Sequence, residues 1–147
     1  MCLMLYIGTA SRLPLTSSPE LRIEAVKDAR GAVRQWFSQP EVRFVGAHTG
    51  CSCGFPSFIA DSPVEYYAEM PLDSDDRLAD LRSVRALVAL LDQIIIRDDS
   101  VELYPVADGD EAKIPKGLVE WQLDTLDPER FFFTEGFKHV VRRKAAV

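Results

Sequence analysis

Residues 74–96 read SDDRLADLRSVRALVALLDQIII and form the most regular part of the sequence. Apolar residues recur there at spacings of three and four, which predicts one long amphipathic helix from about Ser74 to Ile96. Ser74 suits the N-cap, and the aspartates beside it suit the positive end of the helix dipole. The apolar stripe consists of Leu81, Val84, Leu87, Val88, Leu91, Ile94 and Ile95. Such a wide stripe predicts that the helix covers one face of a sheet.

The segments on either side of this helix carry strand patterns, either continuous apolar runs or alternating apolar and polar residues. The predicted extended segments are Cys2–Ile7, Leu21–Ala25, Val42–Ala47, Val101–Val106, Phe131–Phe133 and Phe137–Val141, with Val64–Met70 as a further candidate. Pro105 suggests that its strand lies at an edge. A short helix is predicted from Asp28 until Pro40 stops it, while residues 116–126 fit a helix or a strand equally.

Together these elements predict a single domain over residues 1–147, of the α/β or α+β class. Its expected form is a single-layer mixed sheet of about five strands, covered by roughly two or three helices. Hydrophobic residues make up 47% of the chain and charged residues 27%, which excludes intrinsic disorder.

Charge and targeting signals limit the classes of partner. The chain has 17 Lys and Arg against 23 Asp and Glu, a net charge of −6, which disfavours binding to nucleic acid or to an anionic membrane. The apolar start lacks a basic region, and the longest uncharged stretch, Phe44–Ala60, contains glycine and proline. Neither a signal peptide nor a membrane span is therefore predicted, and a cytoplasmic location is expected. Homo-oligomerisation and the identity of any partner stay open.

One loop carries residues suited to chemistry: GAHTGCSCGF, residues 46–55, contains His48, Cys51 and Cys53. The glycines around the two cysteines give the backbone freedom to bring both sulfur atoms to one point. Such a loop also presents backbone N–H groups, which lower the pKa of a thiol. This pattern favours a thiol or redox site in which Cys51 and Cys53 act as nucleophile and resolving thiol and His48 acts as the base. Whether the chain is an enzyme stays undecided.

A transition-metal site is the alternative interpretation of the same loop. Zinc takes thiolate and imidazole ligands, so Cys51, Cys53 and His48 supply three of its four ligands. Cys2 supplies the fourth if the first strand lies beside the strand that precedes the loop. Met4 shares a strand face with Cys2, which keeps Cu(I) open. A third interpretation makes Cys2 a small core residue and the loop thiols incidental, in a non-enzymatic binding or assembly module.

Two further features, the serine between the loop cysteines and His139, are expected to be structural and not catalytic. The segment Gly50-Cys-Ser-Cys-Gly54 matches the G-x-S-x-G nucleophile elbow of hydrolases, but Phe55-Pro56 is a poor helix start and the chain is short for that fold. His139 is expected to be an ordinary strand residue, because apolar residues surround it.

The opening MCLMLYIGT, residues 1–9, taken with GAHTGCSCGF, residues 46–55, resembles a family of small uncharacterised bacterial proteins. The similarity extends through most of the chain, as far as Phe131–Val141. The resemblance implies a bacterial, cytosolic protein and supplies no activity. It also implies that Cys2 and the loop cysteines belong to one shared pattern, which fits a common site.

Overall fold

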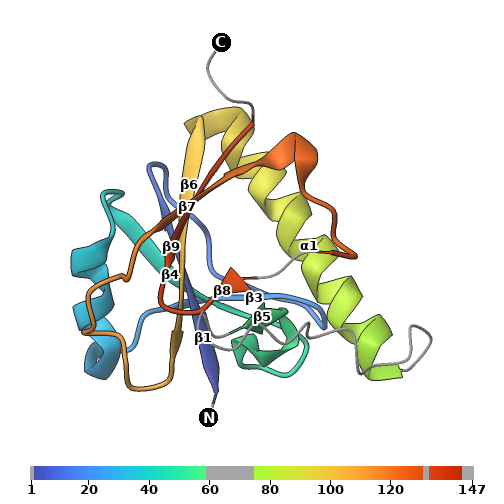
Figure 1. Cartoon of the computed structure of the whole chain (residues 1–147), viewed down its shortest axis with the longest axis horizontal. Helices are drawn as coiled ribbons and strands as arrows, with labels where there is room; N and C mark the ends of the chain where they lie inside the picture. Colours follow the sequence, from blue (N-terminus) through green and yellow to red (C-terminus); the bar gives the residue numbers. More distant parts are fainter. Residues whose placement is uncertain (1, 59–74, 131–132, 144–147) are drawn as a thin grey trace.

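Strand β1 (Leu3–Thr9) lies at the centre of the main sheet, and its sequence explains that position. A nearly continuous apolar run needs protein on both of its faces, and all residues of β1 except Met4 are buried. The strand pairs antiparallel with β4 (Glu41–Gly46) on one side and with β6 (Ser100–Ala107) on the other (Figure 1).

The structure is a computed structural model that describes residues 2–58, 75–130 and 133–143. The other strands are β2 (Thr16–Ser17), β3 (Arg22–Ala25), β5 (Ser57–Phe58), β7 (Leu118–Gln122), β8 (Phe133–Thr134) and β9 (Lys138–Arg142). Within the described ranges, one sheet has seven strands in the order β2-β3-β4-β1-β6-β9-β7. Neighbouring strands in this sheet run antiparallel, except β9 and β7, which run parallel, so the sheet is mixed. Strands β5 and β8 form a separate parallel pair.

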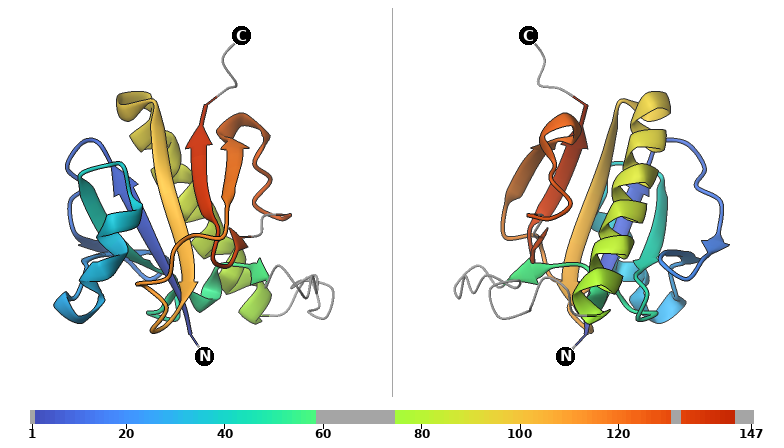
Figure 2. Two further views of the ribbon diagram at one scale, coloured as in Figure 1. Left: turned by 60° about the vertical axis from the view of Figure 1, so that its left-hand side comes forward. Right: turned by 90° about the vertical axis from the view of Figure 1, so that its right-hand side faces the viewer.

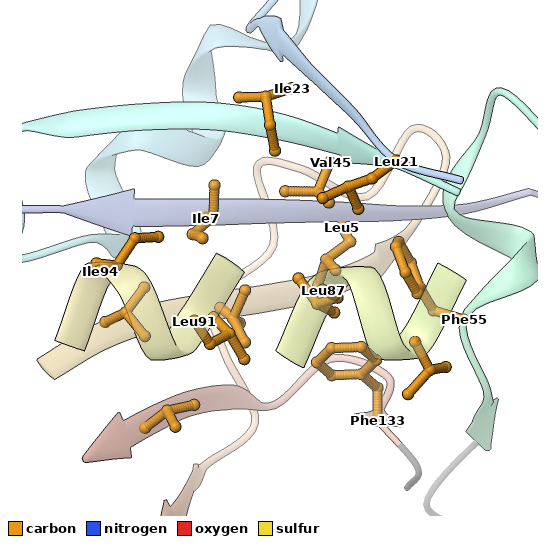
Figure 3. Packing of buried hydrophobic residues seen from close by; sticks show 14 of the residues in the cluster. Leu5, Ile7, Leu21, Ile23, Val45, Phe55, Leu87, Leu91, Ile94 and Phe133 are labelled. Carbon is orange, nitrogen blue, oxygen red and sulfur yellow. The ribbon is translucent and has the colours of Figure 1, made fainter. Parts of the chain in front are cut away.

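Helix α1 (Asp75–Asp98) covers one face of the seven-stranded sheet, as its apolar stripe predicts (Figure 2). Its buried Leu87 and Leu91 belong to the same apolar core as Leu5 and Ile7 of β1 (Figure 3). Each such side chain contributes about 1.5–3 kcal/mol when it is removed from water, so apolar burial attaches the helix to the sheet. The proposed N-cap at residue 74 lies outside the described residues.

The opposite face is covered in part by η1 (Asp28–Trp36), where the predicted short helix is wound as a 3-10 helix (Figure 2). Val33 of η1 is buried in a second apolar cluster on this side of the sheet. Charged groups add to this attachment. The buried carboxylate of Glu102 accepts a hydrogen bond from the backbone N–H of Ser38, at 3.0 Å, and pairs with the ammonium group of Lys138.

The α/β class agrees with the prediction, but the expected strand count was too low. Strands β2, β5 and β8 have only two residues each, which is too short for an alternating pattern to appear. Residues 116–126 contain β7 and the short 3-10 helix η3 (Leu123–Thr125). The segment Val64–Met70 and residues 131–132 lie outside the described residues.

The edge position suggested for Pro105 was wrong, because β6 lies inside the sheet. The pairing of β6 with β9 ends at Leu103, and beyond it the carbonyl of Pro105 accepts a hydrogen bond from Gly136 at 2.7 Å. The proline nitrogen therefore faces a side on which the ladder has already ended, and its missing N–H breaks no strand pairing. Among the described helices, none has both the length and the apolar character needed to cross a membrane.

Candidate functional site

Three free thiols meet at the end of the sheet where β1 begins. Cys2 immediately precedes β1, while Cys51 and Cys53 lie in the loop after β4, around the 3-10 turn η2 (Ser52–Gly54). Their Sγ atoms all lie within 4.8 Å of one another. Cys2 is exposed and the two loop cysteines are half-buried, so small molecules in solution can reach this thiol cluster.

Ser52, the residue between the two loop cysteines, explains how the loop reaches β1. Its buried hydroxyl accepts a hydrogen bond from the backbone N–H of Leu5, at 2.7 Å, and donates one to the carbonyl of Val45, at 2.5 Å. Leu5 and Val45 are opposite each other in the β1–β4 register, so the hydroxyl joins the two strands. A buried hydroxyl engaged in this way has a structural role, which agrees with setting the nucleophile-elbow pattern aside.

Backbone groups fix the rest of the cluster geometry. The backbone N–H of Leu3 donates to Sγ of Cys53 at 3.3 Å, and the carbonyl of Cys2 accepts a hydrogen bond from Asp108 at 2.8 Å. Gly50 has a φ of 86°, a left-handed conformation that glycine adopts without strain, and it reverses the chain just before the first loop cysteine. Both segments of the cluster are therefore held by main-chain contacts.

The surroundings shift the pKa values of the two loop thiols in opposite directions. Burial raises the pKa of Cys51, but hydrogen bonds from the Thr49 hydroxyl, the backbone N–H of Cys53 and the neighbouring thiols outweigh burial, so the net pKa is lowered. The Oγ1 atom of Thr49 lies 3.4 Å from Sγ of Cys51. Burial, together with the hydrogen bond to Cys51 and the charge there, raises the pKa of Cys53 to about 11. Cys51 therefore ionises before Cys53.

His48 lies against helix α1 and is not part of the thiol cluster. Its Nε2 atom is 2.7 Å from Oδ1 of Asp80, and its backbone N–H donates to the Ser83 hydroxyl at 3.0 Å. Among the described residues, the group whose donor atoms all lie within 4.8 Å of one another contains the three cysteines and not His48. The contacts of His48 tie the loop to α1.

Cys51 also lines a pocket of about 390 Å³ beside the cluster. Met4, Tyr6 and Phe44 line the same pocket, and all three belong to the η1 side of the sheet. Cys51 therefore belongs both to the thiol cluster and to the lining of this concave surface.

The expectation that Cys2 is a core residue was wrong, because Cys2 precedes the strand and is exposed. Cys2 was expected to join the loop cysteines if the first strand lies beside the strand before the loop. These two strands, β1 and β4, are paired. Cys2, Cys51 and Cys53 are therefore brought together, whereas His48 contacts Asp80 instead. The bridging role of Ser52 was missed, and no pattern in the sequence indicates it.

No family model, curated protein or solved structure matches this chain. The resemblance based on the two cysteine-containing motifs therefore stays a prediction. The function is inferred from the thiol cluster itself.

Proposed function

We propose that this chain binds one soft transition-metal ion through the thiolates of Cys2, Cys51 and Cys53. The observation that carries the proposal is the convergence of three sulfur atoms, from two segments far apart in the sequence, within 4.8 Å of one another. Thiolates select Zn²⁺ and Cu(I) over harder cations such as Mg²⁺ and Ca²⁺. Two thiols suffice for a redox pair, so the third thiol favours a metal.

The separations of the sulfur atoms suit such an ion. A Zn–S bond of about 2.3 Å places the sulfurs of a tetrahedral site about 3.8 Å apart. Sulfurs within 4.8 Å of one another need to approach by at most about 1 Å, which small side-chain rotations supply. The N–H of Leu3 that donates to Sγ of Cys53 supports the same proposal, because outer hydrogen bonds orient metal-bound thiolates and stabilise their charge.

Three thiolates leave one position of a tetrahedral Zn²⁺ ion for water or another small ligand. Cu(I) is satisfied by three thiolates alone, so both ions fit this donor set. The cytoplasmic location expected from the sequence suits either ion, since a reducing compartment keeps the cysteines free of disulfides.

The test is a zinc titration of the reduced, full-length chain under anaerobic conditions, in competition with a chromophoric chelator. We expect one Zn²⁺ per chain. The variants Cys2→Ser, Cys51→Ser and Cys53→Ser should each weaken binding at least about tenfold, or 1.4 kcal/mol, because each removes one thiolate. Replacement of Zn²⁺ by Co²⁺ should give a sulfur-to-metal charge-transfer band that weakens in all three variants.

His48→Gln is the matched control, since it changes the neighbouring histidine and leaves all three thiols. We expect this variant to bind zinc with unchanged affinity. If His48→Gln loses zinc while Cys2→Ser retains it, the ligands are His48 and the loop cysteines, and the three-thiolate proposal is wrong. A chain that binds no zinc or Cu(I) at all contradicts it as well.

Thiol–disulfide exchange is the second candidate. It is favoured by the difference in pKa between the thiols of Cys51, where the pKa is lowered, and Cys53, where it is raised. The Cys51 thiolate attacks one sulfur of a small disulfide, whose S–S bond breaks and releases one thiolate. Cys53 then loses its proton and attacks Sγ of Cys51, which releases the second thiolate. Two electrons pass from the protein to the disulfide, and the protein retains a Cys51–Cys53 disulfide.

Cys2→Ser separates the two candidates. It removes a metal ligand but leaves the exchanging pair, so exchange with hydroxyethyl disulfide should continue while zinc binding weakens. Cys51→Ser should lose both properties. The measurements are the release of mercaptoethanol and the mass of the product, which is two hydrogen atoms lighter than the reduced chain. No release from either wild type or Cys2→Ser excludes exchange and leaves metal binding untouched.

A further inference from the structure

The pocket beside the thiol cluster is a second feature that metal binding does not use. It has a volume of about 390 Å³ and lies on the η1 side of the sheet, at the end where the loop cysteines are. Three side chains of β1 and β4 line it: Met4, Tyr6 and Phe44. The pocket therefore has an apolar floor of the kind that suits a small organic molecule.

This floor is held in place by the surrounding residues. The rings of Tyr6 and Phe44 pack edge to face, with centroids 6.0 Å apart and planes at 66°. The Tyr6 hydroxyl donates a hydrogen bond to the buried carboxylate of Glu111 at 3.0 Å. Both aromatic rings are at least nine-tenths buried within the fold, so the floor exists before any ligand binds.

The rim of the pocket carries unequal charge. Arg30 is neutralised, because its guanidinium group pairs with Asp108 and, at 2.9 Å, with Glu111. Arg22 and Lys27 are exposed, and within the described ranges no ion pair involves either of them. Glu24 is the one carboxylate among the described residues that line the pocket, because the two carboxylates paired with Arg30 lie outside the lining. Two cations without an ion pair therefore line the pocket together with one carboxylate.

We infer that the pocket binds a small organic anion with a flat apolar body, whose negative group lies between Arg22 and Lys27. The apolar body covers Met4, Tyr6 and Phe44. A cation is disfavoured because two exposed positive groups line the pocket beside a single carboxylate, and a neutral molecule gains nothing from either cation. This inference goes beyond metal binding and does not depend on it.

The position of Cys51 gives the inference a second readout. Cys51 lines this pocket and also belongs to the thiol cluster. A molecule in the pocket therefore lies against Cys51 and should slow the reaction of its thiol with an alkylating reagent. Cys2 does not line the pocket, so its reaction rate should change little.

The test uses three probes of nearly equal shape: 2-naphthoate, 2-naphthamide and 2-naphthylmethylamine. Binding to the reduced, zinc-free, full-length chain is measured by calorimetry and located by backbone amide chemical shifts. We expect 2-naphthoate to bind most tightly and to shift amides around Tyr6, Phe44 and Cys51. It should also protect Cys51 from iodoacetamide, as measured by peptide mass spectrometry.

The double variant Arg22→Gln/Lys27→Gln should weaken 2-naphthoate at least about tenfold, or 1.4 kcal/mol, and leave 2-naphthamide unchanged. Arg82→Gln, an exposed cation on α1, is the matched control and should bind like the wild type. Equal affinity for all three probes, no binding of 2-naphthoate, or an equal loss in the control overturns the inference. Cys2→Ser should bind zinc more weakly and bind 2-naphthoate like the wild type, so the test of the pocket and the test of the metal site can fail separately.

Discussion

The two faces of the seven-stranded sheet are built in different ways. The face under α1 is one continuous apolar core, to which the helix contributes Leu87 and Leu91. The face under η1 has a smaller apolar cluster, and charged residues of β6 and of the loop after it hold the covering segment. Glu102 receives hydrogen bonds from the chain after η1, and Glu111 accepts one from Arg30 at its start.

Both faces carry a pocket, but the two pockets differ in their lining. The pocket beside α1 has a volume of about 320 Å³ and is lined by Ile23, Leu90 and Ile94 among others. The pocket beside η1 has a volume of about 390 Å³, and a loop cysteine, Cys51, lines it. Stability and chemistry are therefore divided between the two faces, and the predictions below test that division from the largest expected effect to the smallest.

Lys138→Met should have the largest effect. Lys138 pairs with the buried carboxylate of Glu102 and donates a hydrogen bond to the carbonyl of Trp36 at 3.1 Å. Removing one partner of a buried pair costs about 3–5 kcal/mol, because the buried carboxylate of Glu102 then loses its counter-charge and keeps only its hydrogen bonds from Ser38 and Gln39. Urea denaturation should show this loss. Lys113→Met, which removes an exposed partner of Asp110, is the control and should cost less than about 1 kcal/mol.

Leu87→Ala tests the other face. Leu87 is fully buried between α1 and the sheet, so the substitution creates a cavity and should lower the free energy of unfolding by about 2–5 kcal/mol. Leu78→Ala is the control on the same helix, because Leu78 is 39% exposed. A similar loss from both substitutions contradicts the description of α1 as a helix with one buried face.

His139 gives the core under α1 a dependence on pH. Burial lowers its pKa to about 4, and the hydrogen bond to the carbonyl of Phe137 opposes this only in part. The unfolded chain binds the proton near pH 6.5 and the folded chain only near pH 4, so stability is lost as the pH falls through this window. The loss is on the order of 3 kcal/mol. The free energy of unfolding, measured by urea denaturation at about pH 7, 5 and 4, should fall less steeply with decreasing pH in His139→Gln than in the wild type.

The long periodic parts of the fold could be predicted from the sequence. The helix expected from Ser74 to Ile96 is observed from Asp75 to Asp98, because many apolar residues repeat with the helical period. The two-residue strands could not be predicted, since their pairing depends on distant segments and not on their own sequence.

The candidate site was predictable only where its geometry depends on residues that are close in the sequence. Cys51 and Cys53 are close in the sequence and flanked by glycine, so their proximity is a local property. The approach of Cys2 depends on the pairing of β1 with β4 and on the bridge that Ser52 makes. His48 is near the cysteines in the chain, but its partner Asp80 is 32 residues away, and no local pattern indicates that contact.

Ser52→Ala tests the bridge between the strands and the thiol loop. The substitution leaves the N–H of Leu5 and the carbonyl of Val45 without their shared partner, which should cost about 1–3 kcal/mol. Ser17→Ala, at an exposed position of β2, should cost almost nothing and is the control. Because the loop loses one of its two hydrogen bonds to β1 and keeps only the one from Leu3, zinc affinity should also fall. Unchanged stability and unchanged zinc affinity contradict the proposed role of Ser52.

Arg143→Gln should have the smallest effect and completes the comparison of the two faces. Arg143 pairs with Asp92 of α1 at 2.7 Å, and both side chains are partly exposed. Because water screens this pair, its removal should cost less than about 1 kcal/mol, and the difference from the wild type should shrink as salt is added. Urea denaturation at low and high salt measures both effects. A loss as large as that of Lys138→Met would mean that charge also holds α1 to the sheet, and the two faces would then not differ in how they are stabilised.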